Sequence, residues 1–450
     1  MYKKYLALSA MAAVQAAASD HWAVIVAGSN GYGNYRHQAD TCHAYQIMKA
    51  NGIPESQIIH MAYDDIAHNP SNPFPGQIFN KPTAAGVAGN DVYAGCNIDY
   101  KGNTVTAANL LAVLTGDAAK AGGKVLKSGP NSRVFFYFAD HGAPGLVAMP
   151  VGPYLYADQL NTAFIQMQSN NMYKELVFYL EACESGSMFQ NILKPNQNIY
   201  AVSAANPSES SWGTYCSPDD SVNGKHINSC LGDLFSVNWM EDSDVAKMNV
   251  ETLQQQWQTV KTETTQSQVM QWGDLSWTSE PIGDFEAGTV DGPKDMKWWK
   301  KLANIGKEAL KEALDVNVTL SKRKNDFAVD SRDIQLHYLY NMVMVNPTQE
   351  NNLALQTEIQ HRMKVDQRFE KMFPQHMENV KNKTTPLPTD FDCYRRLIQT
   401  YTEECEAVSD YTMKYFKAFV AECEGMKSIP SAIDGTIHRM KNVCTEEAQI

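Results

Sequence analysis

The stretch VFFYF at residues 134–138 decides the fold class, because it is a short run of wholly apolar side chains flanked by polar residues. WAVIVA at 22–27 and LVFYL at 176–180 have the same texture. Short runs rich in β-branched and aromatic residues predict buried strands. Stretches with helical features lie between them, such as ADTCHAYQIMKANG at 39–52, whose glycine is suited to ending a helix. Strands that alternate with helices predict an α/β fold, a mostly parallel sheet flanked by helices.

Two reactive side chains follow the ends of these predicted strands, His141 after the 134–138 run and Cys183 after the 176–180 run. In parallel α/β sheets ligands bind beyond the carboxyl ends of the strands, so the two should lie close together. A thiol beside a histidine can act as a nucleophile with a general base. Their separation of 42 residues, histidine first, is similar to the caspase-type order. We therefore predict Cys183 as nucleophile and His141 as base, with the backbone N–H groups of Gly142 and Cys183 as donors to an oxyanion.

Each of these residues also has a plain structural interpretation. Buried free cysteines are common, so Cys183 alone would more often be a core thiol and His141 a loop histidine. For the whole chain, the corresponding alternative is a catalytically inactive binding or storage protein. The polar segments that follow the two predicted strands, Asp-His-Gly and Glu-Ala-Cys-Glu-Ser-Gly, are typical of exposed loops that carry function. They favour the catalytic interpretation.

The charge distribution excludes one class of partner. The chain of 450 residues has a net charge of −12, with a balance of −11 in residues 1–290, +4 in 291–325 and −5 in 326–450. Nucleic-acid binding needs a basic face, so nucleic acid is not an expected partner. Hydrophobic residues make up 44% of the chain and charged residues 20%, which is sufficient for a buried core.

The amino-acid composition and the pattern of apolar residues change along the sequence and divide the chain into three regions. Residues 19–289 carry the predicted strands, residues 290–325 are rich in lysine and resemble a linker, and residues 326–450 lack strand runs. Within the last region, ALQTEIQHRMKVDQRFEKMF at 354–373 is amphipathic with a helical period. The sequence therefore predicts a large α/β domain, a linker, and a small all-α domain.

Residues 1–18 have the layout of a secretory signal peptide. Lys3 and Lys4 precede an uncharged stretch of Ala, Leu and Met that ends in small residues. The alternative is an N-terminal helix of the mature fold. No other stretch approaches the ~20 apolar residues that a membrane helix needs, so we expect no membrane span. The predicted destination is the secretory pathway, ending either in a lysosome or vacuole or outside the cell.

The nine cysteines, in a chain with such a leader, indicate an oxidising compartment. Because the count is odd, at least one thiol is expected to stay free. Cys216 and Cys230 bracket a polar stretch and are expected to staple a surface loop. Four more form a group in the tail whose spacing allows three pairings, namely Cys393, Cys405, Cys423 and Cys444. The remaining three are Cys42, Cys96 and Cys183.

Several long and unusual strings stand in one order along the first part of the chain. They are HWAVIVAGSNGYGNYRHQAD (21–40), YFADHG (137–142), YLEACESGSM (179–188), AANPSESS (204–211) and LGDLFSVNWMEDSD (231–244). Together they resemble the legumains, or asparaginyl endopeptidases, of the caspase-like cysteine protease clan. The resemblance covers residues 21 to about 280 and extends to the remainder only in layout. It implies a caspase-like α/β protease domain, made as a precursor with a small helical inhibitory prodomain.

The resemblance implies roles for individual positions. Asn34 is similar to the asparagine that orients the catalytic histidine. Other matched positions imply a pocket for the residue before the cut bond, here called P1. They are Arg36, Glu181 and Asp233 on its floor, Ser210 and Ser211 on its wall, and His37 in the string that contains Arg36.

The chemistry of the floor residues agrees with an asparagine pocket. An asparagine carboxamide offers one acceptor oxygen and an NH2 group with two donors. Arg36 can donate to the oxygen, while Glu181 and Asp233 can accept from the NH2 group. A charged aspartate would face two carboxylates. We therefore predict hydrolysis after asparagine at mildly acid to near-neutral pH, and after aspartate only in acidic solution.

The linker and tail are expected to keep such an enzyme inactive until it is processed. The resemblance implies activation by self-cleavage at a bond in the linker, for which we nominate Asn325. It also implies the disulfides Cys393–Cys423 and Cys405–Cys444. Expected partners are the chain's own prodomain, protein and peptide substrates, and cystatin-type inhibitors, with no cofactor and no metal.

Further expectations concern modification and the reaction type. Asn317 and Asn382 begin glycosylation sequons. Because an acyl-enzyme can be resolved by water or by an incoming amine, transpeptidase (ligase) activity is compatible with the same site. The alternative enzyme is the catalytic subunit of GPI transamidase, which shares the His/Cys arrangement but is similar to a membrane-anchored protein, and this sequence has no evident anchor.

Overall fold

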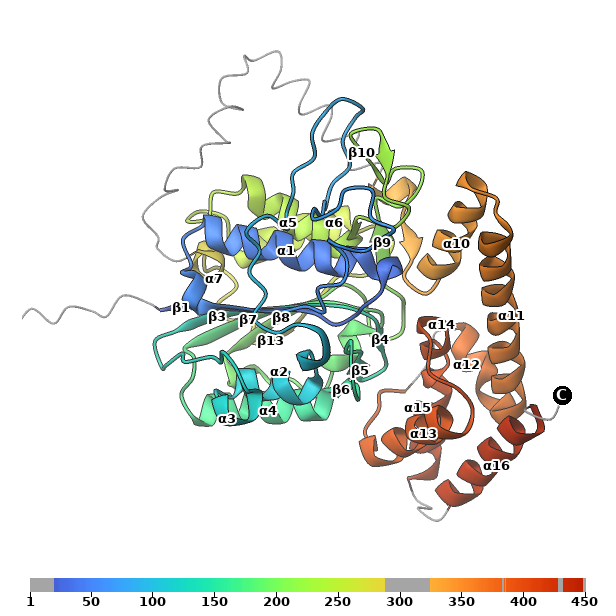
Figure 1. Ribbon diagram of the computed structural model, residues 1–450. Helices are drawn as coiled ribbons and strands as arrows, with labels where there is room; N and C mark the ends of the chain where they lie inside the picture. The colour runs from blue at the N-terminus through green and yellow to red at the C-terminus, as the bar shows by residue number, and fades with distance from the viewer. Residues whose placement is uncertain (1–19, 288–323, 383, 385, 428–431, 448–450) are drawn as a thin grey trace, which may run out of the picture.

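The computed structural model describes residues 20–287, 324–382, 384, 386–427 and 432–447 (Figure 1). At its centre lies a six-stranded sheet in the order β13-β8-β7-β3-β1-β2. Its neighbours pair in parallel except for β13, which lies antiparallel to β8. The strands are β1 (His21–Ala27), β2 (Ile58–Met61), β3 (Arg133–Ala139), β7 (Glu175–Glu181), β8 (Ile199–Ser203) and β13 (Met270–Gly273). The predicted mostly parallel α/β fold is confirmed.

Helices cover both faces of the sheet (Figure 1). On one face lie α1 (Tyr35–Ala50), α5 (Leu234–Val245), α6 (Leu253–Glu263) and α7 (Gly283–Glu286). On the other lie α2 (Ala107–Leu114), α3 (Ala118–Ala121) and α4 (Ala157–Ser169). Every residue of β1 and β7 is buried between these two layers. This two-sided burial explains why the strands are continuous apolar runs in the sequence instead of alternating with polar residues.

Three smaller sheets lie around the central one. The first follows β3 directly and consists of β4 (Gly142–Ala143), β5 (Leu146–Val147) and β6 (Leu155–Tyr156). The second is the hairpin of β10 (Ser221–Val222) and β11 (Lys225–His226). The third joins distant parts of the chain, because β9 (Trp212–Thr214) lies between β12 (Gly232–Asp233) and β14 (Val329–Asp330).

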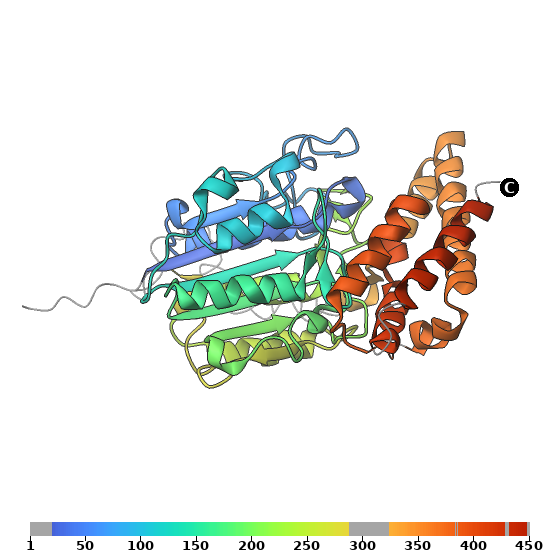
Figure 2. The same cartoon turned by 90° about the horizontal axis from the view of Figure 1, so that it is seen from below.

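A helical unit, residues 334–447, follows β14 and packs against the end of the sheet at which the parallel strands finish (Figure 2). Its helices are α10 (Ile334–Val345), α11 (Gln349–Met372), α12 (Met377–Asn382), α13 (Phe391–Glu404), α14 (Asp410–Met413), α15 (Phe416–Met426) and α16 (Ala432–Glu447). Its core includes Phe369, Tyr401 and Phe419, and continues into Leu146 and Tyr156 of the β4–β6 sheet. The predicted small all-α region is therefore confirmed, and it is docked on the α/β domain through apolar contacts.

Four disulfides are present: Cys42–Cys96, Cys216–Cys230, Cys393–Cys423 and Cys405–Cys444. The last three are the expected pairs, and the first joins two cysteines that the sequence analysis did not assign. Cys183 is free and buried. Among the residues that the structure describes, none of the helices has the length and apolar character to cross a membrane. Residues 1–18, Asn317 and the linker up to residue 323 lie outside the described residues.

Candidate active site

The predicted catalytic pair lies at the ends of two neighbouring strands. β3 and β7 pair in parallel, with Ala139 opposite Glu181, and each chain then continues for two residues to His141 or Cys183. Both side chains are buried, His141 at 3% exposure and Cys183 at 0%. The sheet thus brings to one edge two residues that are 42 positions apart in the sequence.

Hydrogen bonds orient the imidazole of His141. Its Nε2 lies 2.8 Å from Oδ1 of Asn34 and 3.1 Å from Oδ2 of Asp410. Because both partners are acceptors, we assign the proton to Nε2. Nδ1 then carries the free lone pair, and it makes no hydrogen bond within the described residues. The proton acceptor of the ring is therefore open, as a general base for a thiol requires.

Close contacts hold the neighbours of the pair in place. Arg36 Nη1 donates to Oδ1 of Asn34 at 3.3 Å, and Asn34 Nδ2 donates to the carbonyl of Asn30 at 2.9 Å. A Cβ atom on Gly142 would lie 2.3 Å from the carbonyl oxygen of Cys183, so this position must be glycine for the two loops to approach. His141, Asn34 and the loop that carries Cys183 therefore form one packed unit.

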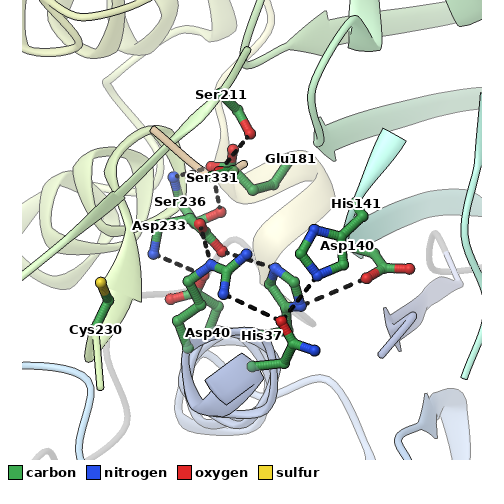
Figure 3. Close-up of polar contacts among 12 residues, drawn as sticks. His37, Asp40, Asp140, His141, Glu181, Ser211, Cys230, Asp233, Ser236 and Ser331 are labelled. Atoms are coloured by element: carbon green, nitrogen blue, oxygen red, sulfur yellow. Dashed lines mark hydrogen bonds and ion pairs between the residues drawn. The ribbon is translucent and has the colours of Figure 1, made fainter. Parts of the chain in front are cut away.

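Arg36 provides an open donor at the base of the site. Its guanidinium is buried, and Nε donates to Oδ1 of Asp233 at 2.8 Å. His37 lies beside Asp233, with its Nε2 at 3.4 Å from Oδ2 of that residue (Figure 3). Its Nδ1 lies 2.6 Å from Ser29 Oγ. The Nη2 group of Arg36 makes no hydrogen bond within the described residues. Leaving a buried donor unpaired costs about 1–3 kcal/mol, so this nitrogen is suited to a ligand oxygen.

Three buried carboxyls, those of Asp40, Glu181 and Asp233, lie near one another (Figure 3), and that of Asp233 pairs with the guanidinium of Arg36. Glu181 Oε2 accepts from the backbone N–H and the hydroxyl of Ser236 at 3.0 and 2.9 Å. Burial raises the pKa of all three carboxyls, and repulsion from Asp233 adds to this for the other two. The adjacent Arg36 opposes the rise in the pKa of Asp233. The site therefore presents hydrogen-bond acceptors beside an open donor.

Ser211 connects the nucleophile to these carboxyls. Its backbone N–H donates to Cys183 Sγ at 3.4 Å, and its hydroxyl oxygen lies 3.8 Å from the same sulfur. The hydroxyl also hydrogen-bonds with Glu181 (Figure 3). Ser210, one residue earlier, hydrogen-bonds with the carboxyl of Asp330. Ser211 therefore links the Cys183 thiol to the carboxyl of Glu181, whereas Ser210 contacts the C-terminal segment.

A short strand from the C-terminal part of the chain lies across the site. β14 pairs antiparallel with β9, with Val329 opposite Gly213. The backbone N–H of Ser331 donates to the carbonyl of Ser211 at 3.0 Å, and the hydroxyl oxygens of these two serines are 3.2 Å apart. Addition of an extended strand to an exposed edge is a common way for proteins to bind peptides. β14 and Ser331 therefore occupy the place that an extended peptide would take beside Cys183.

Charged side chains from the same part of the chain close over the site. Arg332 Nη2 donates to the carbonyl of Gly142 at 2.6 Å and to Glu184 Oε2 at 2.8 Å. Lys417 Nζ lies 2.9 Å from the other carboxylate oxygen of Glu184. The backbone carbonyl of Asp410 accepts from Arg332 Nη1 at 3.1 Å. These contacts tie the helical unit to the residues on either side of the catalytic pair.

Burial in this closed arrangement determines the protonation of the pair. It raises the pKa of the Cys183 thiol to about 11, although Arg332 acts in the opposite direction. It lowers the pKa of His141 to about 4, against the effect of Asp410. Near neutral pH both groups are therefore uncharged. Little of the reactive thiolate is present in this state.

The nominated cleavage residue, Asn325, lies outside the site. Its Oδ1 accepts from the hydroxyl of Thr265 at 2.7 Å, and the carbonyl of Lys324 accepts from the hydroxyl of Thr214 at 2.7 Å. Asn325 stands six residues before Ser331, so its bond is not presented to Cys183 in this arrangement. Asn382, in the second sequon, is exposed at the end of α12.

One group of side chains at the site has metal-ligand spacing. Ligand atoms of His37, Asp140 and His141 all lie within 4.8 Å of one another. Nitrogens of both rings are already engaged, with Ser29 and Asn34 respectively. Burial raises the pKa of Asp140, which opposes the charged form that binds metal. The arrangement is better suited to thiol–imidazole chemistry than to holding an ion.

Several residues at the site escaped the sequence analysis. They are Asp40 and Ser236 beside the floor, Glu184 after the nucleophile, and Arg332, Asp410 and Lys417 from the C-terminal part. Asp40, Glu184 and Ser236 lie within the quoted strings, which could have directed attention to them. The other three carry no local signal, because their contacts depend on how the helical unit docks.

Comparisons with known proteins indicate the family. Residues 21–296 match the peptidase C13 family, and residues 353–444 match the legumain prodomain. The chain is 39% identical over 434 residues to a vacuolar-processing enzyme of Vicia sativa, covering 91% of this chain and 84% of that protein. It is 40% identical over 441 residues to the vacuolar-processing enzyme delta-isozyme of Arabidopsis thaliana, with coverage of 93% and 91%. For the legumain of Canavalia ensiformis the identity is 37% over 429 residues, with coverage of 89% and 84%.

A match to the crystal structure of caspase-1 from Spodoptera frugiperda has a TM-score of 0.36 at 9% identity, covering 61% of this chain and 93% of that one. The two family matches fall on the α/β domain and on the helical unit, respectively. The chain therefore belongs to the peptidase C13 family, and it is a cysteine-type endopeptidase made with a legumain prodomain.

Proposed function

We propose that this enzyme hydrolyses peptide bonds on the carboxyl side of asparagine. The observation that carries the proposal is the floor of the site, where the open Nη2 donor of Arg36 stands beside the carboxyls of Glu181 and Asp233. An asparagine side chain complements this arrangement, because its oxygen accepts from the guanidinium and its NH2 group donates to the carboxyl oxygens.

The catalytic steps follow from the orientation of His141. Its Nδ1 takes the proton of the Cys183 thiol, and the thiolate attacks the carbonyl carbon of the P1 residue. We assign the backbone N–H groups of Gly142 and Cys183 as donors to the resulting oxyanion. His141 then protonates the leaving amine, and water hydrolyses the thioester. Asn34 keeps the ring oriented throughout, through its contact with Nε2.

The chain's own C-terminal segment keeps the precursor silent in this scheme. Ser331 lies at the wall of the P1 pocket, where its backbone N–H bonds with Ser211 as that of a substrate residue would. A serine side chain ends in a hydroxyl group and carries no carboxamide for Arg36 and Glu181 to bind. The segment therefore binds as a substrate does but lacks the side chain that the pocket recognises.

Removal of the helical unit is expected to make Cys183 reactive. In the precursor burial raises the thiol pKa to about 11, which leaves about a hundredfold less thiolate near neutral pH than an ordinary cysteine thiol of pKa 9.0 has. We expect iodoacetamide to alkylate Cys183 about 100-fold faster in the mature enzyme than in the precursor, as followed by peptide mass spectrometry. The other eight cysteines are in disulfides and serve as an internal control. Equal rates in the two forms would contradict shielding by the C-terminal segment.

Peptides that differ only at P1 test the specificity of the mature enzyme. We expect asparagine to exceed glutamine in kcat/KM by about 10⁴, because the longer side chain displaces the carboxamide from buried donors and acceptors that then stay unpaired. Aspartate should be cut only as the pH falls, because acid protonates the substrate carboxyl and the pocket carboxyls, whose pKa values are raised, and so removes their repulsion. Equal rates for the three peptides across pH 4–7 would refute the proposed pocket.

We infer the following processing and location. A protease domain of residues 19–289, an activation linker of 290–325 and an inhibitory domain of 326–450 remain our division of the chain, with cleavage at Asn325. The four disulfides favour an oxidising secretory route. The names of the vacuolar-processing relatives favour a vacuole or lysosome as its end point. Protein substrates and cystatin-type inhibitors are the partners we expect for the opened site.

A further inference from the structure

Glu184 is a buried carboxylate held directly beside the catalytic thiol. It follows Cys183 in the chain, is 1% exposed, and has a left-handed backbone with φ of 50°. Its backbone N–H donates to the carbonyl of Glu209 at 2.7 Å, and its own carbonyl accepts from the hydroxyl of Ser187 at 2.6 Å. A non-glycine residue held in this conformation by fixed bonds is typical of functional sites. The position of the carboxylate is thus set by the protease domain itself.

The cations that neutralise this carboxylate come from the part of the chain that activation would remove. Arg332 Nη2 lies 2.8 Å from one oxygen of Glu184, and Lys417 Nζ lies 2.9 Å from the other. Both side chains are almost fully buried, at 5% and 6% exposure. Once they leave, the carboxylate is left without these two partners. A buried charge in that condition attracts another cation.

The path of the C-terminal segment shows which part of a substrate would meet Glu184. Ser331 is bonded through its backbone to Ser211, whose own N–H donates to the Cys183 sulfur. The guanidinium of Arg332, the next residue, donates to the carbonyl of Gly142 at 2.6 Å and to Glu184, the residue after Cys183. The segment therefore passes Cys183 between residues 331 and 332. Arg332 takes the place of the first residue after the cut bond, here called P1′.

We propose that Glu184 and the carbonyl of Gly142 form a subsite for a basic side chain, arginine or lysine, at P1′ of the substrate. The inference rests on the proposed cleavage after P1 asparagine. The two groups offer acceptors and no donor, and one nitrogen of Arg332 already bridges them. A guanidinium or ammonium group matches this pair, whereas an acidic P1′ side chain would be repelled by the carboxylate.

Peptides with asparagine at P1 and arginine, lysine, alanine or glutamate at P1′ test the subsite on the mature enzyme. We expect kcat/KM for arginine to exceed that for glutamate by on the order of tenfold or more. In a Glu184→Gln variant, this ratio should fall close to one, because the amide has no net charge. An Asp158→Asn variant is the matched control. Asp158 also pairs with the helical unit, through Arg395, but takes no part in the contacts around Cys183, so its ratio should equal that of the wild type.

The outcomes separate this inference from the function on which it rests. If no peptide with asparagine at P1 is cut, the proposed function fails. If the peptides are cut but the wild type shows equal rates with arginine and glutamate at P1′, the subsite is wrong. A Glu184→Gln variant that keeps the wild-type ratio also overturns it. If that variant does not fold, the salt dependence of the wild type tests the subsite instead. Added salt screens the charge of Glu184 and should reduce the ratio of kcat/KM for arginine to kcat/KM for glutamate at P1′. A ratio that does not change with salt would contradict the subsite.

Discussion

A Cys183→Ala precursor is expected to lose peptide hydrolysis and self-maturation together, by a factor on the order of 10⁴ or more. In the proposed mechanism the thiol forms the acyl-enzyme, whereas His141 and the oxyanion donors can act only on a nucleophile that is present. The measurement is mass spectrometry of wild type and variant after acid incubation, which reports the size of the protein and the products of an added asparagine peptide. Because the thiol is buried and makes only weak contacts with Ser211, the variant should keep its fold.

A Cys183→Ser variant is the matched control for this loss, because it keeps a nucleophilic atom of similar position but much lower reactivity. Circular dichroism should show that both variants fold like the wild type. If a Cys183→Ala enzyme still cuts the peptide, the result would favour the alternative hypothesis that Cys183 is a structural thiol. It would also remove the basis for assigning His141 as the base.

The Cys183→Ala precursor can serve as a substrate with which to locate the activation bond, because it is not expected to cut itself. Asn325 lies away from Cys183 in the closed state, so we expect it to be cut by a second, active molecule. Mature wild type added to Cys183→Ala precursor should produce a new N-terminus at Asp326. An Asn325→Gln substitution in the same precursor should block that cut. If the doubly substituted precursor still matures to the same size, the nomination of Asn325 is wrong.

A Ser331→Asn precursor is expected to cut its own chain between residues 331 and 332. The backbone of Ser331 is already bonded to Ser211 as a P1 residue would be, and its hydroxyl points at the same wall. Asparagine at this position would add the carboxamide that the proposed pocket of Arg36, Glu181 and Asp233 would bind. We expect a fragment that begins at Arg332, formed at least about 10³-fold faster than from wild type, as measured by intact-mass analysis over time.

Two further variants make this result decisive. Ser331→Gln adds an amide of the wrong length and should stay uncut. Ser331→Asn combined with Cys183→Ala should also stay uncut, which would show that the cleavage needs the thiol. If Ser331→Asn remains intact while asparagine peptides are hydrolysed by the mature enzyme, then the segment does not lie in the register of a substrate.

Much of the fold was predictable because it depends on local patterns. The sequence runs that form β1, β3 and β7 are apolar on both faces. A strand that is buried on both faces needs apolar side chains on both, whatever its position in the sheet, so the run itself identifies the strand. β2, β8 and β13 were not identified. β2 and β13 have only four residues each, and β13 is only half-buried, so neither produces a strong apolar signal. The two-residue strand β14 could not be predicted at all, because its pairing with β9 is made across more than a hundred positions of sequence.

The sequence by itself pointed to the catalytic pair. His141 and Cys183 each follow the end of an apolar strand, and neighbouring parallel strands bring such positions to one edge of the sheet. The roles predicted for Asn34, Arg36 and Glu181 came from the resemblance to the legumains.

Only the tertiary structure decided how that site is closed. Asp410 and Lys417 make their contacts because the helical unit docks on the α/β domain, and Ser331 and Arg332 make theirs on the segment that leads into that unit. No local periodicity encodes the surface that such a unit will meet. The protonation of the pair was also decided by the folded structure, because burial raises the pKa of Cys183 and lowers the pKa of His141, and burial is a property of the whole fold.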